Sequence, residues 1–154
     1  CEPNVNFNTK AELNNHKIES NAMIDTGNLL KEPISGKPVI IVENDLLKTA
    51  LPEEILNNTQ NIIQGNTQEI PIEYISKLRV IPFTSLGMPN GMLLGMKAES
   101  VTIYSEDEKI LAENIIIGLY DKKLSKTGKY TSLIGISLIE GRKTENEHIG
   151  YVKI

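Results

Sequence analysis

Apolar and polar residues alternate along residues 17–24, and this alternation runs directly into a group of turn-forming residues. One face of the segment carries Ile18, Ser20, Ala22 and Ile24, and the other carries Lys17, Glu19, Asn21 and Met23. A period of two is typical of a β-strand that is buried on one face. Asp25, Thr26, Gly27 and Asn28 follow, and both Asp and Gly favour tight turns. We therefore predict a strand that carries the Asp25 carboxylate onto a short, rigid loop.

Further strand-length segments are separated by turn-forming residues along the rest of the chain. The predicted strands cover residues 39–42, 78–83, 92–101, 110–120, 133–134 and 151–154, and the strand at 110–120 is expected to break at Gly118. Residues 87–91, with the sequence Gly-Met-Pro-Asn-Gly, predict the turn of a β-hairpin. Short helices are expected over 44–51, after Pro52 and over 136–140, and a surface loop over 57–65. This pattern favours a mostly β fold of many short strands.

One domain is expected to account for nearly the whole chain. The 154 residues are enough to build one hydrophobic core. Residues 1–16 contain five Asn and show no clear period, so we expect a polar lead-in there, followed by one domain over 17–154. The chain begins with Cys1 rather than Met, which suggests a segment of a longer protein.

Composition excludes several classes of function. The net charge of −4 gives no reason to expect nucleic-acid binding. No apolar run approaches the roughly 20 residues that cross a bilayer. The single cysteine excludes an internal disulfide and fits a reducing compartment. His16 and His148 lack partners at ligand spacing, so we expect neither a metal site nor a cofactor.

Asp25 is the strongest candidate for a catalytic residue, because a carboxylate on a rigid loop suits acid–base chemistry. Peptide hydrolysis by carboxylates needs two of them, one to draw a proton from the attacking water and one to protonate the carbonyl oxygen. The two share a proton, because carboxyls about 3 Å apart cannot both ionise. The sequence contains only one apolar-Asp-Thr-Gly segment. A catalytic pair would therefore come from two copies of the chain across a two-fold axis.

Each of these features has an alternative interpretation. Asp25-Thr26-Gly27 is also an ordinary turn sequence. The hairpin around 87–91 is either a mobile flap over a substrate or an ordinary hairpin whose Met residues lie in the core, and its apolar tip equally suits a partner or a membrane. The basic loop formed by Lys122, Lys123, Lys126 and Lys129 is expected to be a solvated surface.

Two segments resemble parts of aspartic peptidases. Met23–Gly27 looks like the active-site loop of these enzymes. Ser132–Ile139 looks like the two apolar residues and glycine that precede the C-terminal helix in the retroviral-type enzymes.

A longer set of motifs is similar to one family, the sporulation sigma-E factor-processing peptidases of Bacillus-like bacteria, known as the SpoIIGA family. The similarity begins with Asp25–Leu30 and continues through Glu32-Pro33 and Gly36–Val39. Arg79–Phe83 and Gly87–Gly91 share it, and it extends from about residue 18 to about residue 140.

This resemblance implies a retropepsin-like acid peptidase barrel, one domain per chain with a short C-terminal helix, that acts as a homodimer without a cofactor. Asp25 would be catalytic, and Thr26, Gly27 and Asn28 would complete the active-site loop. Asn28 departs from the Ala or Ser usual in retroviral and pepsin-like enzymes and matches the sporulation family. The hairpin over 83–96 would be the flap, and its candidates for substrate binding are Gly87, Met88, Gly91 and Met92.

The same resemblance implies an aspartic endopeptidase that removes the N-terminal pro-segment of the sigma-E factor precursor. It also implies a membrane-embedded portion ahead of this domain, and a location on the cytoplasmic face of the cell membrane, on the mother-cell side of the sporulation septum. Activity would depend on an activator protein secreted from the forespore. The alternative function is a non-catalytic peptide- or partner-binding module on the same barrel, in which Asp25 is only a turn residue.

Overall fold

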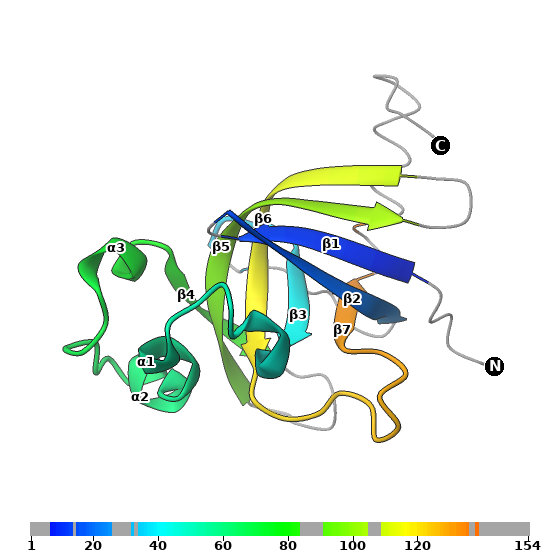
Figure 1. Cartoon of the computed structure of the whole chain (residues 1–154). Coiled ribbons are helices and arrows are strands. Elements are labelled where there is room, and N and C mark those ends of the chain that lie inside the picture. Colours follow the sequence, from blue (N-terminus) through cyan, green and yellow to red (C-terminus); the bar gives the residue numbers. More distant parts are fainter. Residues whose placement is uncertain are drawn as a thin grey trace.

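Seven strands and four short helical segments make up the described part of this computed structural model, which comprises residues 7–13, 15–25, 32, 34–83, 91–104, 109–135 and 138. The strands are β1 (Phe7–Leu13), β2 (His16–Asp25), β3 (Val39–Glu43), β4 (Leu78–Phe83), β5 (Gly91–Tyr104), β6 (Lys109–Tyr120) and β7 (Ser132–Gly135). Between β3 and β4 lie the 3-10 helix η1 (Asn44–Leu47) and the helices α1 (Glu53–Leu56), α2 (Thr59–Ile63) and α3 (Ile72–Ile75). The three α-helices lie together at one side of the strands (Figure 1).

The strands close into a barrel of six. Their hydrogen-bonded order is β1-β2-β7-β3-β6-β5-β4, and β1 also pairs with β5. One edge of β5 therefore pairs with β4 through Gly91–Met96 and with β1 through Ser100–Tyr104, while the other edge pairs with β6. Closure of a sheet removes its exposed edges. This barrel confirms the predicted mostly β fold and is compatible with a retropepsin-like peptidase (Figure 1).

The core fills the barrel, and a smaller apolar layer lies on the opposite faces of several strands. Residues of the smaller layer are Val39, Ile41, Ile81, Leu93, Ile116, Tyr120, Leu124 and Leu133. All residues of β3 and β7 are buried, so both strands are covered on two faces. Two-sided burial explains why these strands read as continuous apolar runs rather than alternating ones.

In each of the two longest strands, β5 and β6, the residues that face the core change from even-numbered to odd-numbered positions partway along. The core residues are Leu94, Met96, Ala98, Val101 and Ile103 on β5, and Ile110, Ala112, Ile115, Ile117 and Leu119 on β6. The parity changes where the register passes from Ala98–Ile115 to Ser100–Glu113. Asn114 has a φ of 60°, a left-handed conformation that Asn adopts more readily than most residues. The regular alternation predicted over 92–101 is therefore wrong beyond Ala98.

Three other predictions differ from the structure. Within the expected lead-in over 1–16, Phe7–Leu13 forms β1, and its Ala11 and Leu13 are buried. The expected loop over 57–65 contains α2, because Ile62 packs into the core. Gly118 does not break β6, and a Cβ there would lie 3.4 Å from side-chain atoms of Ile41 and Val39. This glycine leaves room for side chains of β3 rather than ending a strand.

Some predicted elements are shorter than expected or lie outside the described residues. The helix expected over 44–51 is a 3-10 helix that ends at Leu47. Of the helix expected over 136–140, only Leu138 is described, and it is helical and buried. The strand expected over 151–154 lies outside the described residues. Among the helices of the described ranges, none has the length and apolar character needed to cross a membrane.

Candidate active site

Asp25 is the last residue of β2, and its backbone lies beside Gly135, the last residue of β7. The two strands run parallel, and their pairing begins at Ala22 and Ser132. On its other edge β7 pairs antiparallel with β3, so β7 is the central strand of three. The predicted buried strand at Leu133-Ile134 is thereby confirmed, and it runs alongside the residues that lead into Asp25.

The alternation predicted for the strand that leads to Asp25 is also confirmed. Ile18, Ser20 and Ala22 are buried, whereas Lys17, Glu19 and Asn21 are exposed. The buried face packs into the barrel core together with β1. Asp25 therefore follows a strand whose orientation is determined by burial. Thr26, Gly27 and Asn28, the other predicted residues of the active-site loop, lie outside the described residues.

The connection from β6 to β7 is anchored by hydrogen bonds on both sides of β7. Thr131 N donates to Asn21 O at 2.9 Å, and Glu43 N donates to Thr131 O at 3.1 Å. The Glu43 carboxylate is buried at the end of β3, and its Oε2 accepts a bond of 2.7 Å from Leu124 N. Burial raises the pKa of the Tyr120 hydroxyl, and the nearby charges of Asp121 and Glu43 raise it further. The anchoring role of Glu43 was not predicted from the sequence, where its only signal was an acidic residue directly after an apolar strand.

The predicted hairpin is confirmed, because β4 and β5 pair antiparallel from Leu78–Met96 to Phe83–Gly91. Met92 pairs with Pro82, and Leu94 pairs with Val80. Paired residues project from the same side of a sheet, so these four share one face. Leu94 is only 1% exposed, whereas Val80 and Met92 are 40% and 47% exposed. The core-facing surface of the barrel thus continues into an exposed apolar surface toward the end of the hairpin formed by Phe83 and Gly91.

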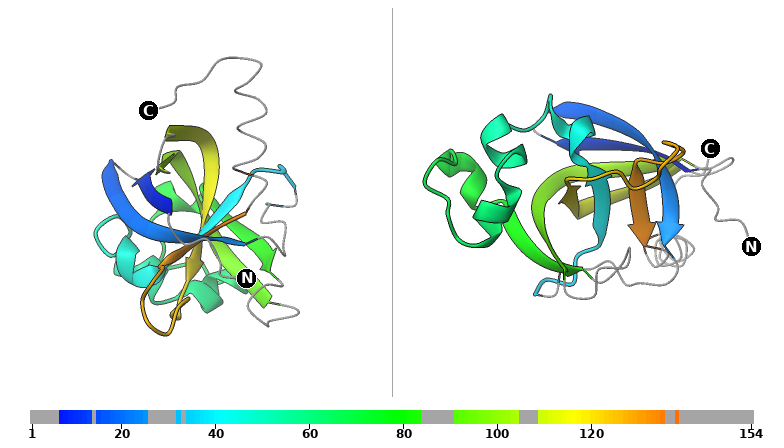
Figure 2. Two further views of the ribbon diagram at one scale, coloured as in Figure 1. Left: turned by 90° about the vertical axis from the view of Figure 1, so that its right-hand side faces the viewer. Right: turned by 90° about the horizontal axis from the view of Figure 1, so that it is seen from below.

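The expected flap residues divide between described and undescribed parts of the chain. Gly91 and Met92 are described, whereas Gly87 and Met88 lie outside the described residues. Met96 is fully buried, as expected of an ordinary hairpin, but Met92 is exposed. In the right-hand view of Figure 2, β2, β7 and β4 all end toward the same side of the barrel. The strand that carries Asp25 and the exposed part of the hairpin are therefore directed to one side.

Glu32 organises the turn that leads into β3. Its carboxylate accepts hydrogen bonds from Ile34 N through Oε2, and from both Ser35 N and Ser35 Oγ through Oε1, at 2.9, 2.9 and 2.5 Å. The Ser35 hydroxyl and the Ile34 amide hold the pKa of Glu32 below its usual value. Glu32 belongs to the motif that resembles the sporulation family, and its part in this motif is structural: the side chain closes the turn.

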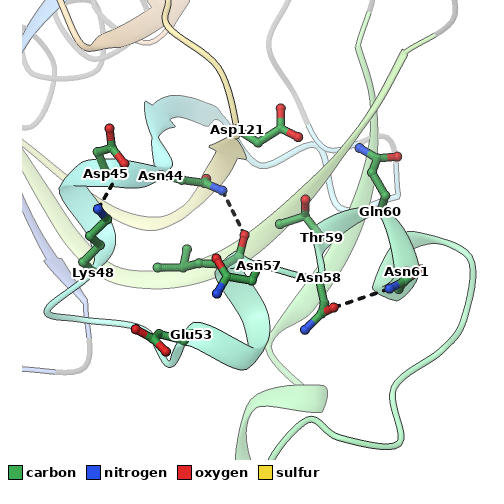
Figure 3. A pocket seen from close by; sticks show the side chains of 11 residues that line it. Asn44, Asp45, Lys48, Glu53, Asn57, Asn58, Thr59, Gln60, Asn61 and Asp121 are labelled. Atoms are coloured by element: carbon green, nitrogen blue, oxygen red, sulfur yellow. Dashed lines mark hydrogen bonds and ion pairs between the residues drawn. The ribbon is translucent and has the colours of Figure 1, made fainter.

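The pocket drawn in Figure 3 does not contain the predicted site residues. It has a volume of about 570 Å³ and lies between η1, α1, α2 and the end of β6. Its lining is mostly polar, and Asn44 Nδ2 donates to Leu56 O at 3.3 Å while Lys48 pairs with Asp45 at 3.4 Å. No group of three His, Cys, Asp or Glu side chains suited to a metal ion occurs within the described ranges.

Comparisons with known proteins identify relatives over most of the chain. A family model described as sporulation factor SpoIIGA matches residues 2–138. The sporulation sigma-E factor-processing peptidase of Priestia megaterium is 30% identical over 128 residues, which cover 82% of this chain and 42% of the relative. The peptidase of the same name from Bacillus subtilis is 28% identical over 145 residues, which cover 89% of this chain and 45% of the relative.

The chain spans less than half the length of these two relatives. No solved structure is significantly similar to it.

Proposed function

Because this chain belongs to the SpoIIGA family of sporulation factors, we propose that it is the peptidase domain of a protein that processes the sigma-E factor precursor. Its relatives carry the name sporulation sigma-E factor-processing peptidase. The single observation that carries the proposal is the backbone of Asp25 beside Gly135, at the end of two parallel strands, of which β2 is buried on one face and β7 on both. A catalytic carboxylate is positioned best on a rigid element, and glycine keeps the neighbouring backbone uncovered.

The proposed mechanism is that of an aspartic endopeptidase that works as a homodimer. Two Asp25 carboxyls, one from each copy, share one proton. The ionised carboxylate takes a proton from the attacking water, and the protonated carboxyl donates to the carbonyl oxygen of the scissile peptide. This stoichiometry follows from the single Asp-Thr-Gly in the sequence. A heterologous contact would not bring two identical residues together, so the interface has two-fold symmetry.

The hairpin of β4 and β5 is proposed to cover the bound peptide. Its exposed apolar face, formed by Val80, Pro82 and Met92, supplies contact area for the side chains of an extended substrate. Met adapts its shape to irregular apolar groups more readily than branched residues. Closure over the substrate would exclude bulk water from the reaction.

The substrate and setting complete the proposal. The protein removes the N-terminal pro-segment of the sigma-E precursor, from the cytoplasmic face of the cell membrane on the mother-cell side of the septum. We propose that a membrane anchor lies ahead of this domain, and the chain spans less than half the length of its relatives. A forespore-secreted activator raises the effective concentration of one tethered domain for another, which favours assembly of the Asp25 pair.

Replacement of Asp25 tests the catalytic assignment. The Asp25→Asn variant of the full-length protein, co-expressed with the sigma-E precursor, is expected to cleave about a hundredfold to ten-thousandfold more slowly. The matched control is Asp121→Asn, which removes an exposed carboxylate after β6 and is expected to leave cleavage unchanged. Cleavage is measured as the size change of the precursor. Undiminished cleavage by Asp25→Asn favours the non-catalytic binding module.

Mixed expression tests the dimer. When wild type and Asp25→Asn are present in equal amounts, random pairing leaves roughly one quarter of the dimers with two wild-type carboxyls. Activity is therefore expected to fall with the square of the wild-type fraction. A linear fall at constant total protein would mean that each chain acts alone.

A further inference from the structure

Three hydroxyl side chains lie inside the barrel on three neighbouring strands. Thr9 on β1, Ser20 on β2 and Ser132 on β7 are 3%, 6% and 0% exposed. Thr9 pairs with Ser20 in the register of β1 and β2. We call these three residues the hydroxyl seam. It crosses the strand that ends at Asp25 and the two strands beside it.

Direct hydrogen bonds connect the members of the seam. Thr9 Oγ1 donates to Ser20 O at 3.2 Å. Ser20 Oγ donates to Ser132 Oγ at 2.5 Å, and Ser132 Oγ donates to Asn21 O at 3.2 Å. Each hydroxyl therefore has a partner on a neighbouring strand. Buried polar groups that are fully paired in this way add directional contacts to a core that is otherwise apolar.

The apolar residues around the seam do not by themselves determine how far β7 is displaced along β2. The two strands share a register of four residues, from Ala22–Ser132 to Asp25–Gly135. A slip of two residues would keep the same faces of β7 inside and outside, because side chains alternate with a period of two. Burial of Leu133 and Ile134 therefore tolerates that slip, whereas the bond between Ser20 and Ser132 does not.

The consequence falls on Asp25. In the observed register Asp25 lies beside Gly135, which has no side chain. A slip of β7 by two residues toward the C-terminal end of β2 would place Leu133 beside Asp25 instead. Buried polar contacts are known to select one register among several that hydrophobic packing permits.

We propose that the hydroxyl seam is a positioning device that sets the register of β7 against β2 and so places Asp25 beside Gly135. Ser132 is the main positioning residue, since its hydroxyl bonds to both Ser20 and the backbone of Asn21. The register itself stands independently of any enzymatic activity, whereas its effect on catalysis rests on the proposed function.

Amide hydrogen exchange of the 154-residue chain, measured by NMR, tests the register directly. In Ser132→Ala, exchange of the Ile24 and Ile134 amides is expected to accelerate on the order of tenfold, as for loss of about one buried hydrogen bond. Exchange at Leu94 and Ile117, in the β5–β6 hairpin, is expected to stay within about twofold of wild type. Equal acceleration in both regions, or none in either, would overturn the proposal.

Two further variants keep the test decisive. Ser125→Ala removes another buried serine hydroxyl, which accepts a bond from Lys129 N in the loop before β7, and it is expected to leave the Ile24 and Ile134 amides unchanged. Thr9→Val keeps the shape of the side chain and removes the bond to Ser20 O. If Ser132→Ala does not fold, Thr9→Val is expected to accelerate amide exchange in β1 and β2 and to leave exchange in the β5–β6 hairpin unaffected. Equal acceleration in β1, β2 and the β5–β6 hairpin would overturn the proposal.

A kinetic measurement separates positioning from general stability. Cleavage by full-length Ser132→Ala is expected to show a kcat lowered about tenfold to a hundredfold with an unchanged KM, since a displaced carboxylate affects the reaction more than binding. Ser132→Thr, which retains a hydroxyl, is expected to recover most of the kcat. Cleavage at the wild-type rate by Ser132→Ala would refute the proposed role of the hydroxyl seam in positioning Asp25. Absence of cleavage by wild type, with the exchange pattern as expected, refutes the proposed function alone.

Discussion

The β5–β6 hairpin and the β2–β7 pair hold their strands together in different ways. β5 and β6 are 14 and 12 residues long, close neighbours in the sequence, and pair along nearly their whole length. β2 and β7 come from distant parts of the chain and pair over four residues. The hairpin contributes a long row of apolar residues to the core, while the β2–β7 pair is crossed by the hydroxyl seam.

The difference reflects the cost of bringing distant segments together. A hairpin closes a short loop, so its register is determined by the turn and by many consecutive contacts. A short parallel pair between distant segments has few contacts with which to reject a neighbouring register. The directional hydrogen bonds of the hydroxyl seam favour the observed register of β7 over its neighbours. We therefore expect substitutions in the hairpin to change overall stability, and substitutions in the seam to change the position of Asp25.

Truncation of a buried side chain in the β5–β6 hairpin is expected to have the largest effect on stability. Ile117 is fully buried in the barrel, so Ile117→Ala should lower the free energy of unfolding by about 2–5 kcal/mol. Denaturant unfolding measures this change. The control on the same strand is Leu111→Ala, which removes a side chain that is 55% exposed and should cost about 0.5 kcal/mol or less. A loss of kcat per folded molecule in Ile117→Ala would contradict the division of roles between the two regions.

Two glycines that face each other in the β5–β6 hairpin test how tightly its residues are packed. A Cβ on Gly95 would lie 2.5 Å from Ile81 Cδ1 and 2.8 Å from Ile116 Cγ2, so Gly95→Ala is expected to cost about 1–3 kcal/mol through overpacking. Gly118 lies opposite Gly95, and the nearest atoms to a Cβ there are 3.4 Å away. Gly118→Ala should therefore cost less than about 1 kcal/mol. Thermal unfolding measures both losses of stability. If the two variants lose the same stability, the β5–β6 hairpin relaxes around an added methyl group.

The smallest expected effect is a pH dependence at the turn before β3. The folded-state pKa of Glu32 is lowered by the Ser35 hydroxyl and the Ile34 amide. Its stabilising contribution is therefore present above the unfolded-state pKa and is lost as the pH falls through the lowered folded-state pKa. The difference in Tm between wild type and Glu32→Gln should shrink from pH 7 toward pH 3. Glu53→Gln, at an exposed position of α1, serves as the control, and an equal pH dependence there would assign the effect to net charge.

Local patterns predicted the elements that depend on near neighbours. The alternation over 17–24 identified β2, and the turn residues at 87–91 identified the hairpin of β4 and β5. β1 was missed because its buried face carries Thr9 and Ala11, which are small or polar and give a weak alternation. α2 was missed because only two of its five residues, Ile62 and Ile63, are apolar.

Asp25 was singled out by its flanking strand and turn residues, whereas Glu43, Ser20 and Ser132 were not recognised as parts of a polar framework. A buried serine or glutamate is indistinguishable in a sequence from an exposed one until its partner is known. The partner of Ser132 lies 112 residues away. No local pattern contains that information.

The sequence by itself determined most of the strands after β1, that one Asp-Thr-Gly follows a half-buried strand, and which family the chain resembles. These features depend on side-chain periodicity and turn chemistry, which act between close neighbours. Only the tertiary structure decided the closure of the barrel, the change of core-facing positions at Asn114 and the placement of Asp25 beside Gly135. Those features depend on contacts between distant segments, where burial and hydrogen bonding select one register among several that local preferences allow.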